Sequence, residues 1–209
     1  MSKVFDPKEL CEIVNKGIGL PREQMFKVVH EELLRKYPGH IRKNPRWIFN
    51  VAGGAMGQIQ ILHGSLSEYL IFFGTPIGTE GHSGRYIADI WDRTMEGEAW
   101  CYLEGETERR VYKPGDEMYL RKGKAKGYCV KDHAWMLEYG RGCIPMMMPF
   151  GALASNMFNT LDCATVERTF RDFGGCVIRE LLKGKIQAIP LVESYGSLAV
   201  WYVSAMPRP

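Results

Sequence analysis

Several sequence signals that would assign this chain to a known chemistry are missing. Its 209 residues contain no G-x-S-x-G nucleophile elbow, no P-loop, no G-x-G-x-x-G fingerprint and no D-D-x-x-D motif for a magnesium diphosphate. The six cysteines include no C-x-x-C pair, and the five histidines lack the spacing of a metal-binding barrel. We therefore expect no metal, no cofactor, and cysteines that stay reduced.

Signals for secretion, for membrane spanning and for nucleic-acid binding are missing too. The N-terminus has no signal peptide, and no window reaches the roughly 18 uncharged apolar residues of a spanning helix. A net charge of +3 is too small to indicate a nucleic-acid partner. The one mild basic cluster, at 121–126, is interpreted as a solvated turn or strand edge.

The helical signals lie at the two ends of one expected domain, 1–209. Residues 6–37 predict two helices, because Asp6-Pro7 is a good helix start and Gly17 to Pro21 forms a break. Residues 145–185 predict two more, over 146–158 and 163–182, which would form a lid. The methionines at 146–148 leave two interpretations open: a lid packed on the core, or a lid that also touches a bilayer. Residues 186–209 are read as an extension.

The middle of the chain, residues 46–140, predicts a β-barrel core. Short β-rich runs at 99–103, 110–112, 117–120, 127–130 and 135–139 are separated by glycine turns. Residues 66–73 are apolar and fit either a buried strand or a helix. We expect an α+β fold: a cupin-like β-barrel with N-terminal helices and two C-terminal lid helices.

Acidic residues in apolar surroundings carry the strongest functional signal. Strand alternation places Glu138 on one face with Met136 and Gly140. If that face is the barrel interior, loss of solvent raises the pKa of Glu138 and fits it for general-acid work near neutral pH. A solvated, outward-facing glutamate is the alternative.

The acidic partner of Glu138 is not fixed by the pattern. Asp89 and Asp92 are three residues apart and share a face only on a helix. Either could face Glu138, and either could instead be a capping acid or the partner of a neighbouring arginine. Buried carboxylates usually share a proton or meet a cation.

Several further residues are candidates for contacting a bound molecule. The aromatic rings of Tyr69, Tyr86, Trp91 and Tyr139 could line a cavity and stabilise a cation, although plain core packing is the more common role. Glu68 is a candidate as well, but a structural partner of the backbone or of His63 is favoured for it. His82 is expected to be a turn residue held by hydrogen bonds.

Four longer motifs resemble those of the fungal C-8 sterol isomerases and their relative, the sigma-one receptor. These motifs lie at 53–57, 66–70, 73–86 and 137–145. The resemblance spans roughly residues 5 to 185. It implies a cupin-like barrel with a ligand cavity inside, closed by two C-terminal helices that face the membrane. It also implies trimers in which residues 53–57 have a role.

The resemblance also implies roles for individual residues. In the receptor, the glutamate matching Glu138 meets the ligand amine and is paired with the aspartate matching Asp92. Tyr69 and Tyr86 match aromatic residues of the pocket. In the isomerases, carboxylates of this constellation are thought to move a sterol double bond by protonating one face and removing a nearby proton.

Three features depart from the family pattern. We expect no transmembrane anchor in this chain, and residues 189–209 extend past the usual end. The spacing at 88–92 resembles the receptor more than the fungal enzymes. Together these departures indicate a paralogue with an altered substrate. The expected location is the endoplasmic reticulum membrane surface or the cytoplasm, with peripheral membrane contact.

The resulting hypothesis is an acid/base isomerase that moves a ring double bond in a sterol through a carbocation. Glu138 is the leading candidate for the acid/base residue, and Asp92 is the partner expected to share its proton. Asp89 is the second candidate for that partner. One alternative is a soluble terpene cyclase acting on a linear isoprenoid such as farnesyl diphosphate. Another is a non-catalytic, receptor-like ligand-binding protein. The expected partners are a hydrophobic small molecule and further copies of the chain, which we expect to form a homo-oligomer such as a trimer. We expect no nucleic-acid partner.

Overall fold

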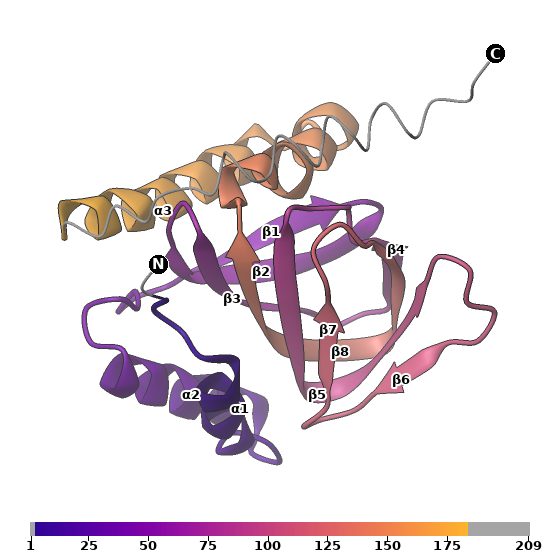
Figure 1. Ribbon diagram of the computed structural model, residues 1–209, viewed down its shortest axis with the longest axis horizontal. Coiled ribbons are helices and arrows are strands. Elements are labelled where there is room, and N and C mark those ends of the chain that lie inside the picture. The colour runs from indigo at the N-terminus through magenta and orange to yellow at the C-terminus, as the bar shows by residue number, and fades with distance from the viewer. Residues whose placement is uncertain (1–2, 184–209) are drawn as a thin grey trace.

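The computed structural model describes residues 3–183. A curled antiparallel sheet forms its centre, with one helical pair packed against its outer side and another lying across its end (Figure 1). The predicted α+β class, with helices at both ends of the sequence, is confirmed. The extension at 186–209 lies outside the described residues. Within residues 3–183, no helix is long and apolar enough to cross a bilayer.

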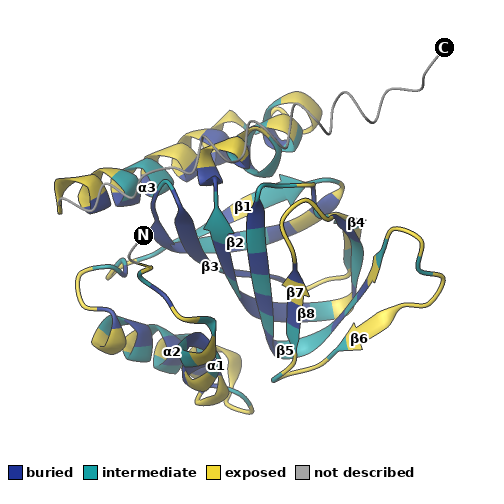
Figure 2. Ribbon diagram, in the orientation of Figure 1, coloured by how far each residue is buried: buried dark blue, intermediate teal, exposed yellow. Residues whose placement is uncertain are grey.

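The N-terminal helices begin and break where the sequence predicts. Helix α1 spans Pro7–Asn15, and the Asp6 carboxylate caps it by accepting from the Lys8 amide at 2.8 Å. Helix α2 spans Arg22–Lys36. Their buried residues pack against the outer face of the sheet, in one apolar cluster with Phe72 and Leu137. The part of the outer face that these helices cover is therefore buried (Figure 2).

Eight strands form one sheet in the order β1-β2-β3-β8-β5-β6, with β4 paired to β8 and β7 paired to β5. The apolar run at 66–73, which fitted a strand or a helix, lies mostly in strand β3. The bounds are β1 Trp47–Ala52, β2 Ala55–Gly64, β3 Glu68–Thr75, β4 Thr79–His82, β5 Ala88–Leu103, β6 Arg110–Tyr112, β7 Glu117–Leu120 and β8 Lys126–Gly142.

The two long strands, β5 and β8, give the sheet its curl. The runs predicted separately at 127–130 and 135–139 are parts of one strand, β8, which pairs with β5 along almost its whole length. The register shifts between Thr94 and Glu96 and again between Gly97 and Ala99. Such bulges bend a long strand pair and increase its twist. Gly97 has φ +81°, and a Cβ there would lie 2.0 Å from the His133 carbonyl oxygen.

The C-terminal helices lie across one end of the curled sheet (Figure 1). A short 3-10 turn, η1 (Ile144–Met146), leads into the π-helix η2 (Pro149–Asn159), and α3 spans Cys163–Leu182. Asn50 of β1 donates to the Gly151 carbonyl at 2.8 Å, and the buried Asn156 side chain accepts from the Val51 amide at 3.1 Å. Both of the predicted lid helices are thus present, and η2 is anchored to β1.

Candidate functional site

The curled sheet and the C-terminal helices enclose a chamber of about 170 Å³. Most of its wall is apolar, and the charged side chains in it, Asp92, Lys126 and Glu138, come from the neighbouring strands β5 and β8. The lid contributes residues from η1, η2 and α3. The lining residues used below are Tyr69, His82, Tyr86, Asp92, Lys126, Tyr128, Glu138, Met147, Met148, Thr169 and Phe173.

Asp92 and Glu138 are cross-strand neighbours in this wall. They lie directly opposite each other in the β5–β8 ladder, and both line the chamber. Cross-strand neighbours have Cβ atoms about 4.5–5.5 Å apart, close enough for two carboxyl groups to interact. Asp92 is only 4% exposed. The alternation that places Glu138 with Met136 also holds, because Met136 lines the same chamber.

Tyr69 reaches Glu138 diagonally across the β3–β8 ladder. Its hydroxyl donates to Glu138 Oε1 at 2.5 Å. Tyr69 lies opposite Gly140 in the register, and a Cβ on Gly140 would lie 2.0 Å from the Tyr69 ring. The absence of a side chain at Gly140 therefore lets the tyrosine ring lie flat on β8 and point its hydroxyl at the carboxyl group.

Burial is the main cause of the raised pKa of Glu138. Loss of solvent, with a smaller contribution from the negative charge of Asp92, raises this pKa to about 8. The Tyr69 hydrogen bond and the Lys126 cation act in the opposite direction. A carboxyl group with this pKa keeps its proton at neutral pH and can donate it.

Lys126 corrects an interpretation made from the sequence. The basic cluster at 121–126 was expected to be solvated, but Lys126 is only 5% exposed and lines the chamber. Its ammonium group forms a buried ion pair with Asp92 Oδ2 and lies 3.0 Å from the sulfur of Met118. Lys126 is the first residue of β8, and the curl of the sheet carries it inward. Its neighbours in the turn gave no signal that could have singled it out.

The second carboxylate oxygen of Asp92, Oδ1, does not take part in the ion pair with Lys126. Asp92 Oδ1 is buried and accepts no hydrogen bond from the described residues. A proton carried by Glu138 across the ladder would meet this unshared oxygen, and the interaction with Asp92 contributes to the raised pKa of Glu138. The two carboxyl groups and Lys126 together can thus hold one acidic proton, one negative charge and one positive charge.

Three of the predicted contact residues line the chamber. Tyr86 and Tyr69 face it, and burial raises the pKa of both phenols. His82, at the end of β4, also lines it, and its Nδ1 accepts from the Gly84 amide at 2.9 Å. His82 is held by hydrogen bonds as expected, but it is the last residue of a strand and not a turn residue. Tyr128 is a further aromatic residue in the wall that the sequence analysis missed.

Asp89 and Trp91 lie on the opposite face of β5 from Asp92, because successive residues of a strand alternate between faces. Asp89 accepts from the Tyr119 hydroxyl at 2.8 Å and from the Lys122 amide at 3.0 Å. Trp91 stacks on Tyr139 with ring centroids 5.2 Å apart. Neither residue lines the chamber. The structure therefore selects Asp92, not Asp89, as the neighbour of Glu138.

Glu68 and Tyr139 form a second buried pair on that outer face. The Tyr139 hydroxyl donates to Glu68 Oε1 at 2.5 Å, and the Val4 amide donates to Glu68 Oε2 at 3.0 Å. These contacts tie the N-terminal segment to the sheet, and neither residue lines the chamber. Glu68 thus has the backbone partner that was favoured for it. The predicted substrate contacts of Glu68, Tyr139 and Trp91 are not supported by their positions.

Thr169 of α3 was also missed. It lines the chamber, and its hydroxyl oxygen is buried without a hydrogen-bond partner among the described residues. A threonine in an amphipathic helix gives no signal of such a role in the sequence.

A comparison with protein families matches residues 1–185 to the family described as "ERG2 and Sigma1 receptor like protein". Protein erg2 homolog from Dictyostelium discoideum is 45% identical over 158 residues, which cover 76% of this chain and 67% of that protein. C-8 sterol isomerase erg2 from Aspergillus fumigatus is 42% identical over 186 residues, covering 87% and 77%.

A protein with a different name is about equally similar. Sigma non-opioid intracellular receptor 1 from Taricha granulosa is 42% identical over 181 residues, covering 86% of this chain and 81% of the receptor. Among solved structures, an RmlC-like cupin from Shewanella frigidimarina aligns with a TM-score of 0.40 and 16% identity, covering 46% of this chain and 84% of the cupin.

Proposed function

Because the chain belongs to the ERG2 and Sigma1 receptor like protein family, we propose that it is an acid/base isomerase that moves a ring double bond within a sterol. One observation carries this proposal: Glu138, protonated at neutral pH, and Asp92 face the same apolar chamber from adjacent strands. A C-8 sterol isomerase is among the similar proteins. Such a reaction needs a proton donor, a proton acceptor and a dry, apolar cavity.

The proposed reaction proceeds in two proton transfers. Glu138 gives its proton to one carbon of the double bond, which leaves a carbocation on the ring. A neighbouring carbon then loses a proton to a carboxylate of the Asp92–Glu138 pair, and the double bond forms again in its new position. No electrons are gained or lost overall. When the carboxylate of the pair takes up that proton, the pair again holds one proton.

The surroundings of the pair favour a positively charged intermediate. Charge interactions are strong where water is excluded, so the Asp92 carboxylate stabilises a nearby carbocation. The faces of Tyr69, Tyr86 and Tyr128 add attraction through their π-electrons. Before protonation, the Lys126 cation balances Asp92, so the chamber is suited to a neutral hydrocarbon skeleton.

The chamber must widen for a sterol to fit. A cavity of about 150 Å³ accommodates benzene, and the chamber holds about 170 Å³, which is too small for a four-ring skeleton. Met147, Met148 and Phe173 close it from the lid side. The same helices expose Phe158, Ile178 and Leu182 to solvent. We infer that these helices contact a membrane surface and that substrate enters beneath them.

The proposal is tested by incubating purified protein with an eight-ene sterol in deuterated water and analysing the extract by mass spectrometry. The expected result is a double-bond isomer that carries one deuterium per molecule. Glu138→Gln should abolish turnover without unfolding the protein. The matched control is Glu68→Gln, which alters the equivalent buried glutamate–tyrosine pair outside the chamber and should keep the wild-type rate per folded molecule.

Other outcomes separate the alternatives. Cyclised hydrocarbon from farnesyl diphosphate, with no sterol product, would indicate a terpene cyclase. Tight binding of a hydrophobic amine without turnover would indicate a ligand-binding protein, a role suggested by the similarity to a protein named as a receptor. A Glu138→Gln variant that isomerises sterol at the wild-type rate would refute the assignment of Glu138.

A further inference from the structure

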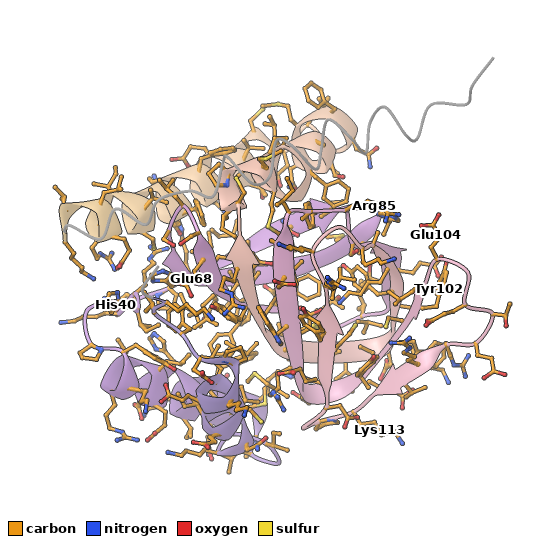
Figure 3. All side chains as sticks on the ribbon, viewed as in Figure 1. His40, Glu68, Arg85, Tyr102, Glu104 and Lys113 are labelled. Atoms are coloured by element: carbon orange, nitrogen blue, oxygen red, sulfur yellow. The ribbon has the colours of Figure 1, made fainter. Side chains whose placement is uncertain are left out.

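A second polar cluster lies outside the chamber, where three distant parts of the chain meet. It consists of His40, from the connection between α2 and β1, His63 from β2, and Glu180 from α3. One possible ligand atom from each residue lies within 4.8 Å of the other two. Figure 3 shows His40 between the N-terminal helices and α3. None of the three residues lines the chamber.

His63 is already arranged as a metal ligand would be. It is fully buried, and its Nδ1 lies 2.9 Å from the His40 carbonyl oxygen, which can only accept a hydrogen bond. Nδ1 therefore carries the proton. In the neutral ring this tautomer leaves an unshared electron pair on Nε2. Metal-binding histidines typically donate their other N–H to a backbone carbonyl in this way.

Nε2 of His63 has no hydrogen-bond partner among the described residues. A buried polar atom left without a partner is costly, and the lone pair of an unprotonated imidazole nitrogen can either accept a hydrogen bond or bind a metal ion. The cluster is therefore not explained by hydrogen bonding within the chain alone.

Glu180 supplies negative charge to the cluster. Lys183 lies 2.8 Å from Oε1 and holds the carboxylate in place. Oε2 lies 2.8 Å from His40 Nδ1. A metal ion would take the position of the proton between these two atoms, and that proton would leave to solvent or to the other ring nitrogen.

From this geometry we propose that His40, His63 and Glu180 bind one Zn²⁺ ion. Two imidazoles and one carboxylate suit zinc, and a water molecule would complete a tetrahedral shell. Small side-chain rotations would draw the three ligand atoms to the roughly 2.0–2.2 Å that zinc requires. The His40 side chain is 16% exposed, which provides a path for the ion from solvent.

The bound ion would connect α3 to the sheet. Because α3 also supplies Thr169 and Phe173 to the chamber, zinc would hold one half of the lid in place. This role is independent of the reaction inside the chamber, since the two sets of residues do not overlap. The proposal therefore stands or falls separately from the isomerase assignment.

The test is zinc titration of the chelator-treated full chain, with calorimetry for stoichiometry and thermal unfolding for stability. One Zn²⁺ per chain and a higher Tm are expected. His40→Asn, His63→Gln and Glu180→Gln should each weaken binding by at least about tenfold. His133→Gln changes a histidine outside the cluster and should bind as the wild type does. His63 is fully buried, so His63→Gln could fail to fold. In that case His40→Asn and Glu180→Gln still decide the test.

Cobalt substitution identifies the ligand type. A visible spectrum of four-coordinate cobalt without a thiolate charge-transfer band would support nitrogen and oxygen ligands. A thiolate band would overturn the proposal and assign the ion to cysteine, of which Cys163 is exposed. Absence of stoichiometric zinc binding, equal affinity in the wild type and all folded variants, or a Tm unchanged by bound zinc would overturn it too.

Discussion

Asp92 and Glu138 lie directly opposite each other on β5 and β8, and the buried Asp92 is also paired with Lys126. Loss of solvent in the chamber wall, together with the negative charge of Asp92, raises the pKa of Glu138.

Glu138 should make the stability of the protein depend on pH. Its pKa is about 8 in the folded chain, against an ordinary value of 4.5. Between these values the folded chain holds a proton that the unfolded chain has lost, so its contribution is fully present below about pH 4.5 and is lost as pH rises to 8. The expected slope is at most about 1.4 kcal/mol per pH unit.

Denaturant unfolding of the wild type and of Glu138→Gln, at several pH values in this window, measures the effect. The wild type should lose stability relative to the variant as pH rises, and the difference should level off above the folded pKa. Other titrating groups are common to both proteins and cancel. A constant difference across the window would show that Glu138 is not protonated in the folded state.

Lys126→Met should destabilise the protein, because Asp92 would keep a buried charge without its partner. Breaking a buried ion pair in this way typically costs about 3–5 kcal/mol. Adding Asp92→Asn should recover much of that loss, since the unpaired charge is then gone. Chemical unfolding of the two single variants and the double variant measures the coupling. Additive losses would contradict a buried Asp92–Lys126 pair.

Tyr69→Phe should shift the pH dependence of activity. The Tyr69 hydrogen bond lowers the pKa of Glu138. Its removal should therefore raise that pKa and move the alkaline limb of the pH–rate profile to higher pH. The loss of one hydrogen bond should also reduce kcat by about tenfold. Tyr139→Phe removes the matching bond to Glu68 and should leave the limb in place. Equal shifts in both variants would argue against a specific role for Tyr69.

Thr169→Val should weaken binding of a substrate that carries a hydroxyl group. The Thr169 hydroxyl is buried in the chamber wall without a described partner, and a substrate hydroxyl could pair with it. We expect a two- to tenfold rise in KM, roughly the worth of one neutral hydrogen bond, with little change in kcat. Thr165→Val makes the same change on α3 away from the chamber. Steady-state kinetics with hydroxylated and deoxygenated sterols would separate the effects, and an equal rise for both substrates would refute the pairing.

Much of the local structure could be predicted because it follows from short-range patterns. The Asp6-Pro7 start and the break before α2 are set by capping and by proline geometry within a few residues. Helix α3 has the predicted bounds because an apolar stripe recurs at helical spacing. Alternation along β8 correctly placed Glu138 with Met136, since side chains of a strand point to opposite faces in turn.

The glutamates show where such patterns stop being informative. Glu68 is buried and Glu138 is half-buried, and each carboxylate accepts a hydrogen bond from a tyrosine hydroxyl at 2.5 Å. One faces the chamber and the other faces the N-terminal helices. Both faces of the sheet are apolar because each is covered, one by α1 and α2 and the other by the lid. Hydrophobic pattern alone cannot tell a packed interface from a cavity wall.

The sequence by itself determined the helices, several of the strands, the family motifs and the face that Glu138 shares with Met136. Only the tertiary structure decided that Asp92 rather than Asp89 meets Glu138, that Lys126 enters the chamber, and that His40, His63 and Glu180 come together. The physical reason is the sequence separation over which each effect acts, because periodicity and capping depend on residues only a few positions apart. Curling of the sheet and docking of α3 instead join groups far apart in the chain, as with His40 and Glu180, which are 140 residues apart.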